Sequence, residues 1–156
     1  GHFAHGMNQL NDLGFTDVIK EHALTQQKPI LGICLGMQLM TNYSEEGDVD
    51  GLGLIDAQTK KFQLQDKSLK IPHLGWNEVS WQKESPILNS LSEKPRYYFV
   101  HSYFVECNHQ NDVLGTTHYG QDFVSAFEHD NIIGLQFHPE KSHKFGMELL
   151  QNFTKL

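Results

Sequence analysis

The spacing of apolar residues in the first third of the chain predicts helices around one buried strand. Apolar positions recur with helical spacing over residues 7–25, and Gly14 interrupts them, so we expect a helix, a turn and a second short helix there. The apolar run 28–33 predicts a short buried strand, and 35–43 predicts a helix that follows it directly. The polar segment 44–53 contains three glycines and predicts an irregular loop.

The rest of the chain is dominated by short runs of β-branched and aromatic residues, which predict strands. Ser85 followed by Pro86 predicts a short capped helix within this part, and the spacing of apolar residues predicts an amphipathic helix over 143–156. Strands are expected at 54–61, 69–71, within 72–81 after an initial loop, and at 96–107, 112–120, 123–130 and 131–137. This order predicts one mixed α/β domain spanning residues 1–156, with no linker or internal repeat.

Composition and charge narrow the classes of function. The chain has 156 residues, enough for one domain with a hydrophobic core, and a formal net charge of −7 without a cluster of Lys and Arg. Such a surface disfavours nucleic-acid phosphates. No apolar run is long enough for a membrane span, and the first residues do not resemble a signal peptide. The two cysteines are expected as free thiols in the cytoplasm.

The sequence Gly-Ile-Cys-Leu-Gly at 32–36 places a cysteine where the predicted strand meets the predicted helix. A strand-to-helix corner with small flanking residues is the nucleophile elbow, and both glycines are expected to prevent collisions there. The helix N-terminus would favour a thiolate on Cys34, and the N–H of Leu35 would donate to an oxyanion. The alternative is that Cys34 is a small buried side chain without a chemical role.

A nucleophilic cysteine needs a base, and the segment 134–142 contains a candidate. His138 follows a predicted buried strand, where catalytic residues of α/β folds gather. Glu140 lies two residues further on, so its carboxylate would lie on the same side of an extended chain and orient the imidazole. The alternative is an ordinary His and Glu on a surface loop. The ten histidines are scattered without metal-ligand spacing, so no metal site is expected.

Taken together, these segments resemble the class I glutamine amidotransferase family, and within it the glutaminase subunits of imidazole glycerol phosphate synthase, the HisH type. The resemblance runs from Gly1 to the C-terminus, and it implies a flavodoxin-like mixed sheet flanked by helices. The motifs that carry it are GICLGMQLM (32–40), SEEG (44–47), IPHLGWNEV (71–79), YYFVHSY (97–103) and GLQFHPEKS (134–142).

The resemblance also implies roles for individual residues. Cys34, His138 and Glu140 match the family's catalytic triad. The positions that match glutamine-binding residues of the family are Gln38, Glu46, Ser102 and Tyr103. Those that match the mouth facing the synthase partner are Trp76, Tyr98 and Lys141, for which core packing, sheet packing and a solvated charge are the ordinary alternatives.

One departure from the family pattern concerns the start of the chain. The family begins with a βαβ unit, typically roughly 30 or more residues, ending in a glycine-rich loop that supplies part of the oxyanion hole. The opening GHFAHGM matches the family only from the last glycine of that loop. We therefore expect the domain to be N-terminally truncated and to lack one oxyanion donor.

The implied function is hydrolysis of glutamine to glutamate and ammonia without metal or organic cofactor. The ammonia would pass to a synthase subunit, which in histidine biosynthesis is a cyclase of (β/α)₈-barrel type. Three alternatives stay open: a glutaminase that serves a surface-sugar amidotransferase, a catalytically impaired module kept for binding its partner, and a stand-alone cysteine hydrolase of γ-glutamyl compounds.

Overall fold

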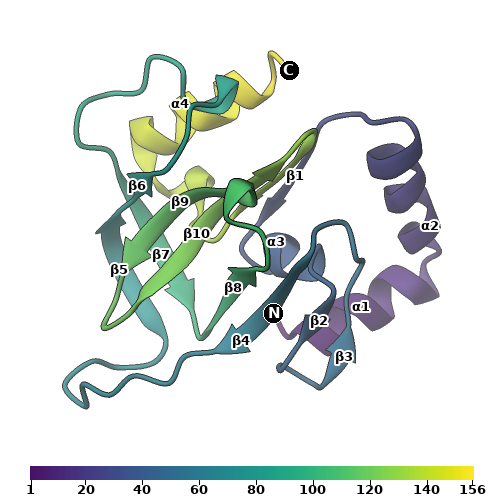
Figure 1. The fold of residues 1–156 in the computed structure, drawn as a ribbon, viewed down its shortest axis with the longest axis horizontal. Helices are drawn as coiled ribbons and strands as arrows, with labels where there is room; N and C mark the ends of the chain where they lie inside the picture. The colour runs from purple at the N-terminus through teal and green to yellow at the C-terminus, as the bar shows by residue number, and fades with distance from the viewer.

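The computed structural model describes residues 1–156 and shows a curled mixed sheet with helices packed against it (Figure 1). The α-helices are α1 (Phe3–Asp12), α2 (Phe15–Lys20), α3 (Leu35–Leu39) and α4 (His143–Phe153). Short turns of other helix types are η1 (Glu21–Thr25), η2 (Pro86–Leu88), η3 (Gln110–Asp112) and η4 (Pro139–Lys141). The strands are β1 (Ile30–Ile33), β2 (Tyr43–Ser44), β3 (Val49–Asp50), β4 (Ala57–Lys61), β5 (His73–Glu78), β6 (Ser80–Trp81), β7 (Arg96–His101), β8 (Tyr103–Cys107), β9 (Val113–His118), β10 (Asp122–His129) and β11 (Ile132–Leu135).

Nine of the strands form the main sheet, whose central order is β1-β11-β10-β8-β4-β2-β3, with β9 and β6 branching from β10. The pairs β1–β11 and β2–β4 are parallel, and the other pairs are antiparallel. Strands β5 and β7 form a separate antiparallel ribbon. Because β1 and β11 are parallel and in register from Ile30–Ile132 to Ile33–Leu135, the segments that follow both strands leave the sheet at the same edge.

Two hydrophobic clusters are built on the sheet. One joins the sheet to α1 and α3 through residues such as Phe3, Met37 and Phe127. The other joins it to the β5–β7 ribbon and α4 through residues such as Phe99, Leu135 and Leu149. The neighbouring residues Ile132 and Ile133 of β11 contribute to different clusters. Both sides of this strand are therefore buried, which explains its continuous apolar sequence.

The expected mixed α/β class and most of the expected elements are confirmed, but two boundaries were wrong. The helix after Cys34 ends at Leu39 and not at residue 43. The Thr41 hydroxyl donates to the carbonyl of Gln38 at 2.8 Å and to that of Tyr43 at 3.2 Å. These side-chain contacts to the backbone compete with continued helix and turn the chain toward β2.

The strand expected at 69–71 is absent, because turn contacts organise the segment before it. Asp66 accepts hydrogen bonds from the Ser68 amide at 2.9 Å and from its hydroxyl at 2.7 Å. This is the turn chemistry of aspartate and serine. The loop 44–53, expected to be irregular, contains the short antiparallel pair β2–β3. The first helix begins at Phe3, four residues earlier than the apolar spacing indicated.

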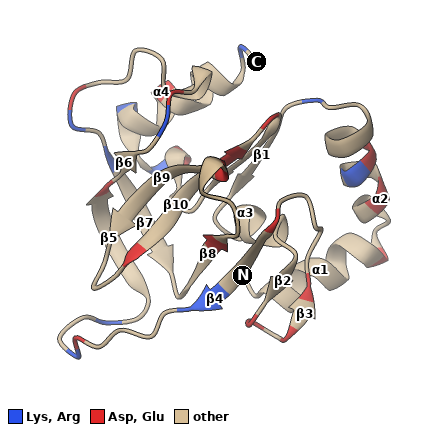
Figure 2. Cartoon of the chain, viewed as in Figure 1, with Lys and Arg blue, Asp and Glu red and all other residues tan.

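Charged side chains are distributed over many elements, with Lys and Arg interspersed among Asp and Glu (Figure 2). None of the helices has both the length and the apolar character that crossing a membrane requires.

Candidate active site

Cys34 occupies a strained corner between β1 and α3. Its backbone has φ 51° and ψ −107°, a conformation that a residue with a side chain rarely adopts. Such strain in a non-glycine residue is typical of functional sites. A Cβ on Gly32 would lie 2.7 Å from backbone atoms of Gly36 and Met37, so this glycine is required for the close approach of strand and helix. The same requirement expected for Gly36 was wrong, because a Cβ there would meet nothing within 4 Å.

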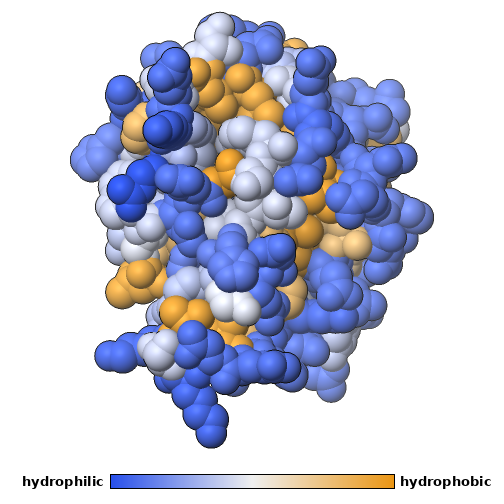
Figure 3. All heavy atoms as spheres, turned by 60° about the vertical axis from the view of Figure 1, so that its left-hand side comes forward, coloured by the Kyte–Doolittle hydropathy of each residue, from blue (hydrophilic) through white to orange (hydrophobic).

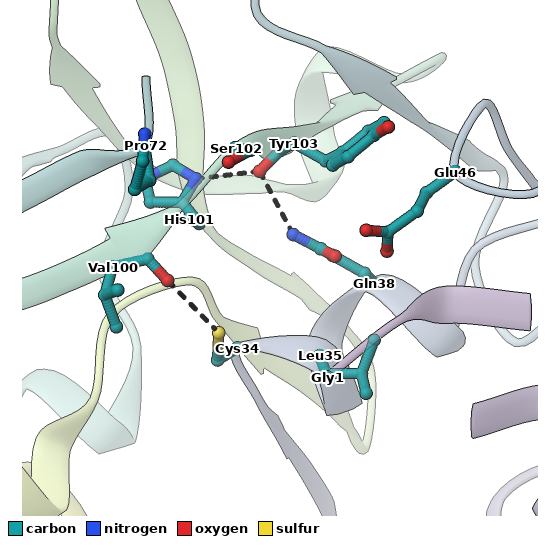
Figure 4. A pocket seen from close by; sticks show the side chains of 10 residues that line it. All are labelled: Gly1, Cys34, Leu35, Gln38, Glu46, Pro72, Val100, His101, Ser102 and Tyr103. Carbon is teal, nitrogen blue, oxygen red and sulfur yellow. Dashed lines mark hydrogen bonds between the residues drawn. The ribbon is translucent and has the colours of Figure 1, made fainter. Parts of the chain in front are cut away.

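The sulfur of Cys34 lies at the wall of a cavity of about 230 Å³ (Figure 4). The structure gathers six of the residues singled out in the sequence around this cavity, although they come from separate segments: Cys34, Leu35, Gln38, Glu46, Ser102 and Tyr103. The remaining lining residues are Gly1, Pro72, Val100 and His101. A small polar molecule would therefore contact the cysteine and all four expected glutamine-binding positions together.

Gln38 is fixed in this cavity by its own side-chain amide. Its Nε2 donates to the carbonyl of Tyr103 at 3.0 Å and to Oε1 of Gln136 at 2.9 Å. Both donors are used, and the amide oxygen has no hydrogen-bond partner in the protein. Gln38 therefore presents an acceptor, which suits a ligand that carries N–H groups.

The other three positions differ in what they offer to a ligand. One carboxylate oxygen of Glu46 accepts the Phe3 N–H at 2.8 Å, so Glu46 also caps the start of α1. The Tyr103 carbonyl accepts from Gln38 at 3.0 Å and from Nδ1 of His101 at 2.7 Å. Both of its lone pairs are thereby used, so its contribution is to hold Gln38 in place. The hydroxyl of Ser102 has no partner within the protein.

The thiol of Cys34 is not activated by its surroundings alone. Its Sγ lies 4.0 Å from the carbonyl oxygen of Val100 and 3.8 Å from Nε2 of Gln136. Burial raises the pKa of Cys34 above its usual value, and the N–H of Leu35 opposes this with a smaller effect. The expected thiolate at the helix N-terminus is therefore not favoured, and α3 has only five residues. A base is needed to remove the proton.

His138 and Glu140 form the expected pair. Nδ1 of His138 lies 2.6 Å from Oε1 of Glu140, an arrangement that places the proton on Nδ1 and leaves Nε2 as the acceptor. His138 lies directly beyond β11, and its N–H donates to the carbonyl of Tyr98 at 2.9 Å. The carboxylate therefore orients the imidazole as a base would require.

No hydrogen bond joins Cys34 to His138 in this structure, but strand β7 lies against both. The carbonyl of Tyr98 accepts from the His138 N–H, and the carbonyl of Val100, two residues along the same strand, faces the sulfur of Cys34. Carbonyls two residues apart on a strand point to the same side. Cys34 and His138 are thus neighbours along one edge of β7, in an arrangement that tightens when substrate binds in enzymes of this kind.

Sequence reasoning missed two residues beside the cavity, His101 and Gln136. His101 is 5% exposed, and its Nε2 lies 3.0 Å from Nδ1 of the equally buried His73. Gln136 is fully buried and contacts both Gln38 and the sulfur of Cys34. The available signal was a polar residue inside an otherwise apolar strand, since a buried polar side chain must find partners. No group of three or more His, Cys, Asp or Glu side chains is arranged to hold a metal ion.

The buried histidines predict that acid destabilises the fold. Burial lowers the pKa of His73 to about 4 and that of His101 to about 3, against an ordinary value of about 6.5. Below about pH 6.5 the unfolded chain binds protons that the folded chain excludes, so the free energy of unfolding falls as pH falls. We expect a loss of up to about 1.4 kcal/mol per pH unit for each histidine, down to its folded-state pKa.

Urea unfolding at several pH values between 7 and 4 measures this loss. His73→Asn removes one of the two titrating groups and should give a shallower dependence on pH. His5→Asn, at an exposed position of α1, is the matched control and should keep the dependence of the unaltered protein. Equal pH dependence in the His73 variant and the control would contradict the prediction.

The three residues expected at the partner face lie near one another. Trp76 and Tyr98 are directly opposite in the β5–β7 ribbon, with ring centroids 6.1 Å apart. Trp76 also stacks on His143, and Lys141 lies on the exposed turn η4 just before it. Trp76 is 39% exposed and its neighbour Leu74 62% exposed. Figure 3, in which the left-hand side of Figure 1 comes forward, shows hydrophobic areas among hydrophilic side chains on this side.

Residues 5–156 match the family model "Glutamine amidotransferase class-I". The chain resembles solved structures of the same kind: a putative GMP synthase protein from Thermoplasma acidophilum (TM-score 0.65, 21% identity, 93% of this chain, 65% of that chain) and a glutamine amidotransferase from Thermotoga maritima (TM-score 0.62, 18% identity, 95% of this chain, 56% of that chain). With its cysteine corner and mixed sheet, the chain belongs to the class I glutamine amidotransferase family.

More similar sequences narrow this assignment. The chain is 51% identical to imidazole glycerol phosphate synthase subunit HisH 2 of Methanococcus maripaludis, over 99% of this chain and 76% of the relative. It is 47% identical to subunit HisH 2 of Pseudomonas aeruginosa, over the whole chain and 77% of the relative. Subunit HisH of Leptospira borgpetersenii is 46% identical, over the whole chain and 78% of the relative. Within the family, the chain is of the HisH type.

Proposed function

We propose that this chain is a glutaminase that hydrolyses glutamine to glutamate and ammonia. The observation that carries the proposal is the cavity beside β1, in which the thiol of Cys34 faces the space that Gln38, Glu46 and Ser102 also line. Its volume of about 230 Å³ suits a molecule the size of an amino acid. The HisH relatives, which are named as subunits of imidazole glycerol phosphate synthase, agree with this activity.

In the proposed mechanism, His138 takes the proton of Cys34 and the thiolate attacks the side-chain amide carbon of glutamine. The N–H of Leu35, which has no acceptor within α3, donates to the oxyanion of the tetrahedral intermediate. His138 then protonates the departing nitrogen, so that ammonia leaves and a γ-glutamyl thioester remains. Water that loses a proton to His138 attacks the thioester, and glutamate and the thiol are released. Glu140 keeps the imidazole oriented and stabilises its charged form.

The amide oxygen of Gln38 suits the α-amino group of glutamine, because it is an acceptor without a partner. The free carboxylate oxygen of Glu46 would attract the same ammonium group. The Ser102 hydroxyl, also without a partner, would donate to the α-carboxylate. These assignments give each end of the amino acid a complementary group and leave the side-chain amide at Cys34.

We further propose that the ammonia passes to the synthase partner within imidazole glycerol phosphate synthase, a (β/α)₈-barrel cyclase, in histidine biosynthesis. Free ammonia is protonated at neutral pH and lost as a nucleophile, so direct transfer protects it. Both cysteines are free thiols, in agreement with a location in the cytoplasm, which we include in the proposal.

The experiment is a measurement of glutamate release from glutamine by the purified chain, alone and with the cyclase encoded in the same genome. The proposal expects hydrolysis that the cyclase stimulates, and formation of the cyclase product with glutamine as nitrogen source. Hydrolysis stimulated only by a surface-sugar synthase would replace the pathway and keep the chemistry. Binding to the cyclase without hydrolysis would instead indicate a partner-binding module.

Trp76 is expected to be an anchor of the partner interface. Trp76→Ala should weaken binding of the cyclase by about 30-fold or more, because a half-exposed tryptophan at the centre of an interface contributes that much. Isothermal titration calorimetry measures the dissociation constant. Phe15→Ala is the matched control, since Phe15 is an exposed aromatic residue on α2, on the opposite side of the molecule from β5 (Figure 1). Similar dissociation constants for both variants would exclude the β5–β7 ribbon as the interface.

A further inference from the structure

A chain of hydrogen bonds crosses the interior from β5 to the cavity. Nδ2 of Asn77 lies 3.3 Å from Nε2 of His73, and Nδ1 of His73 lies 3.0 Å from Nε2 of His101. Nδ1 of His101 lies 2.7 Å from the carbonyl oxygen of Tyr103. No group in the proposed mechanism uses the two histidines, and neither is a candidate for contact with the reacting atoms.

The direction of every hydrogen bond in this chain follows from its end. A carbonyl oxygen only accepts, so the proton of His101 lies on Nδ1, and its Nε2 is an acceptor. His73 must then donate from Nδ1, which leaves its Nε2 to accept from the amide of Asn77. Asn77 is itself oriented by the carbonyl of His118 at 3.0 Å and the N–H of Glu78 at 2.8 Å. Every donor therefore has an acceptor, and both imidazoles are neutral.

Aromatic rings hold the two imidazoles in place. His73 lies between the rings of Tyr119 and Phe99, with centroids at 4.1 and 4.8 Å. His101 packs against Phe62 and Phe123, with centroids at 5.3 and 5.1 Å. The imidazoles therefore have little freedom to turn, and the position of the Tyr103 carbonyl depends on them.

The two ends of the chain have different surroundings. His73 and Asn77 point inward from β5, while Leu74 and Trp76 on the alternate positions of the same strand are exposed. At the other end, the carbonyl of Tyr103 also accepts from Gln38, whose amide oxygen faces the cavity (Figure 4). A shift of β5 would thus be transmitted to Gln38 through these side chains and one carbonyl.

We propose that His73 and His101 are positioning residues, which fix the Tyr103 carbonyl and through it Gln38 for glutamine binding, and which connect the exposed face of β5 to the glutamine site. This inference rests on the proposed glutaminase function. It assigns the two histidines an effect on the affinity for glutamine, and none on the chemical step.

Two amide variants of His101 separate this role from general packing. In His101→Asn the amide nitrogen can occupy the place of Nδ1 and keep the hydrogen bond to the Tyr103 carbonyl. In His101→Gln the amide reaches the place of Nε2 and keeps the contact with His73, while the hydrogen bond to Tyr103 is lost. Each variant loses one of the two hydrogen bonds of His101, so a similar loss of thermal stability is expected for both.

The test is steady-state glutaminase kinetics, measured in the complex with the synthase partner. We expect the KM for glutamine of His101→Gln to exceed that of His101→Asn about tenfold, the effect of one hydrogen bond, with similar kcat values. Equal KM values in the two variants, or a difference in kcat alone, would overturn the positioning role. If the unaltered complex hydrolyses no glutamine, the proposed function itself is overturned.

A spectroscopic measurement tests the same geometry without catalysis. Long-range ¹H–¹⁵N correlation spectra of protein labelled at histidine distinguish the tautomers. We expect His73 and His101 to be neutral with the proton on Nδ1 in both, assigned by comparison with His73→Asn and His101→Asn. A proton on Nε2 of either residue, or a charged imidazole at neutral pH, would overturn the direction of the chain and with it the proposal.

Discussion

Replacing Cys34 by alanine is expected to lower glutamine hydrolysis by at least about a thousandfold, because loss of a nucleophile removes covalent catalysis entirely. No other thiol lines the cavity. The strained backbone of Cys34 and the contact made possible by Gly32 direct its sulfur to the cavity wall. Glutamate release in the presence of the synthase partner measures the loss, and ammonia-dependent synthesis by the complex should continue.

Cys107→Ser is the matched control for this prediction. Cys107 lies at the end of β8, and burial raises its pKa to about 12, so its thiol is a poor nucleophile at neutral pH. We expect this variant to keep its glutaminase activity. A Cys34→Ala protein that still hydrolyses glutamine, or a Cys107→Ser protein that does not, would contradict the assignment of the nucleophile.

Replacing His138 by alanine is expected to lower kcat by about 10²- to 10⁴-fold, the usual contribution of a general base. The effect should be large here because burial raises the pKa of Cys34, so the thiol depends on a base to lose its proton. Glu140→Gln should lower kcat by a smaller factor, since it removes the carboxylate that orients Nδ1 but keeps the base. Stopped assays of glutamate formation measure both.

His129→Ala is the matched control for His138. Nδ1 of His129 lies 2.8 Å from the carboxylate of Asp112, so it forms a pair much like that of His138 and Glu140, but neither His129 nor Asp112 lines the cavity. We expect kcat to remain within about twofold of the unaltered protein, as for surface substitutions away from a site. Equal losses from the two histidine substitutions would indicate a general effect on the fold and would remove His138 from the mechanism.

The parts of the site that were predictable from the sequence are those set by local geometry. Cys34 lies at the end of a short apolar strand and next to glycine, and its position at the corner follows from that order. His138 and Glu140 are two residues apart, so their contact needed no knowledge of the fold. Gln38, Glu46, Ser102 and Tyr103 came from the family resemblance, and the structure brings them to one cavity.

The parts that were not predictable depend on contacts between distant segments. His73 and His101 meet because β5 pairs with β7, and this register is invisible in either strand alone. The end of α3 depends on the Thr41 hydroxyl, and the absence of a strand at 69–71 on the turn at Asp66. The state of the Cys34 thiol depends on burial, which opposes the effect expected from the helix N-terminus.

The most direct test of the central claim is detection of the γ-glutamyl thioester on Cys34. The complex with the synthase partner is mixed with isotopically labelled glutamine, quenched in acid and digested for peptide mass spectrometry. The account predicts a labelled glutamyl group on the peptide that contains Cys34, and none on that of Cys107. Hydrolysis that proceeds with the label on Cys107, or without any labelled peptide, would contradict the account.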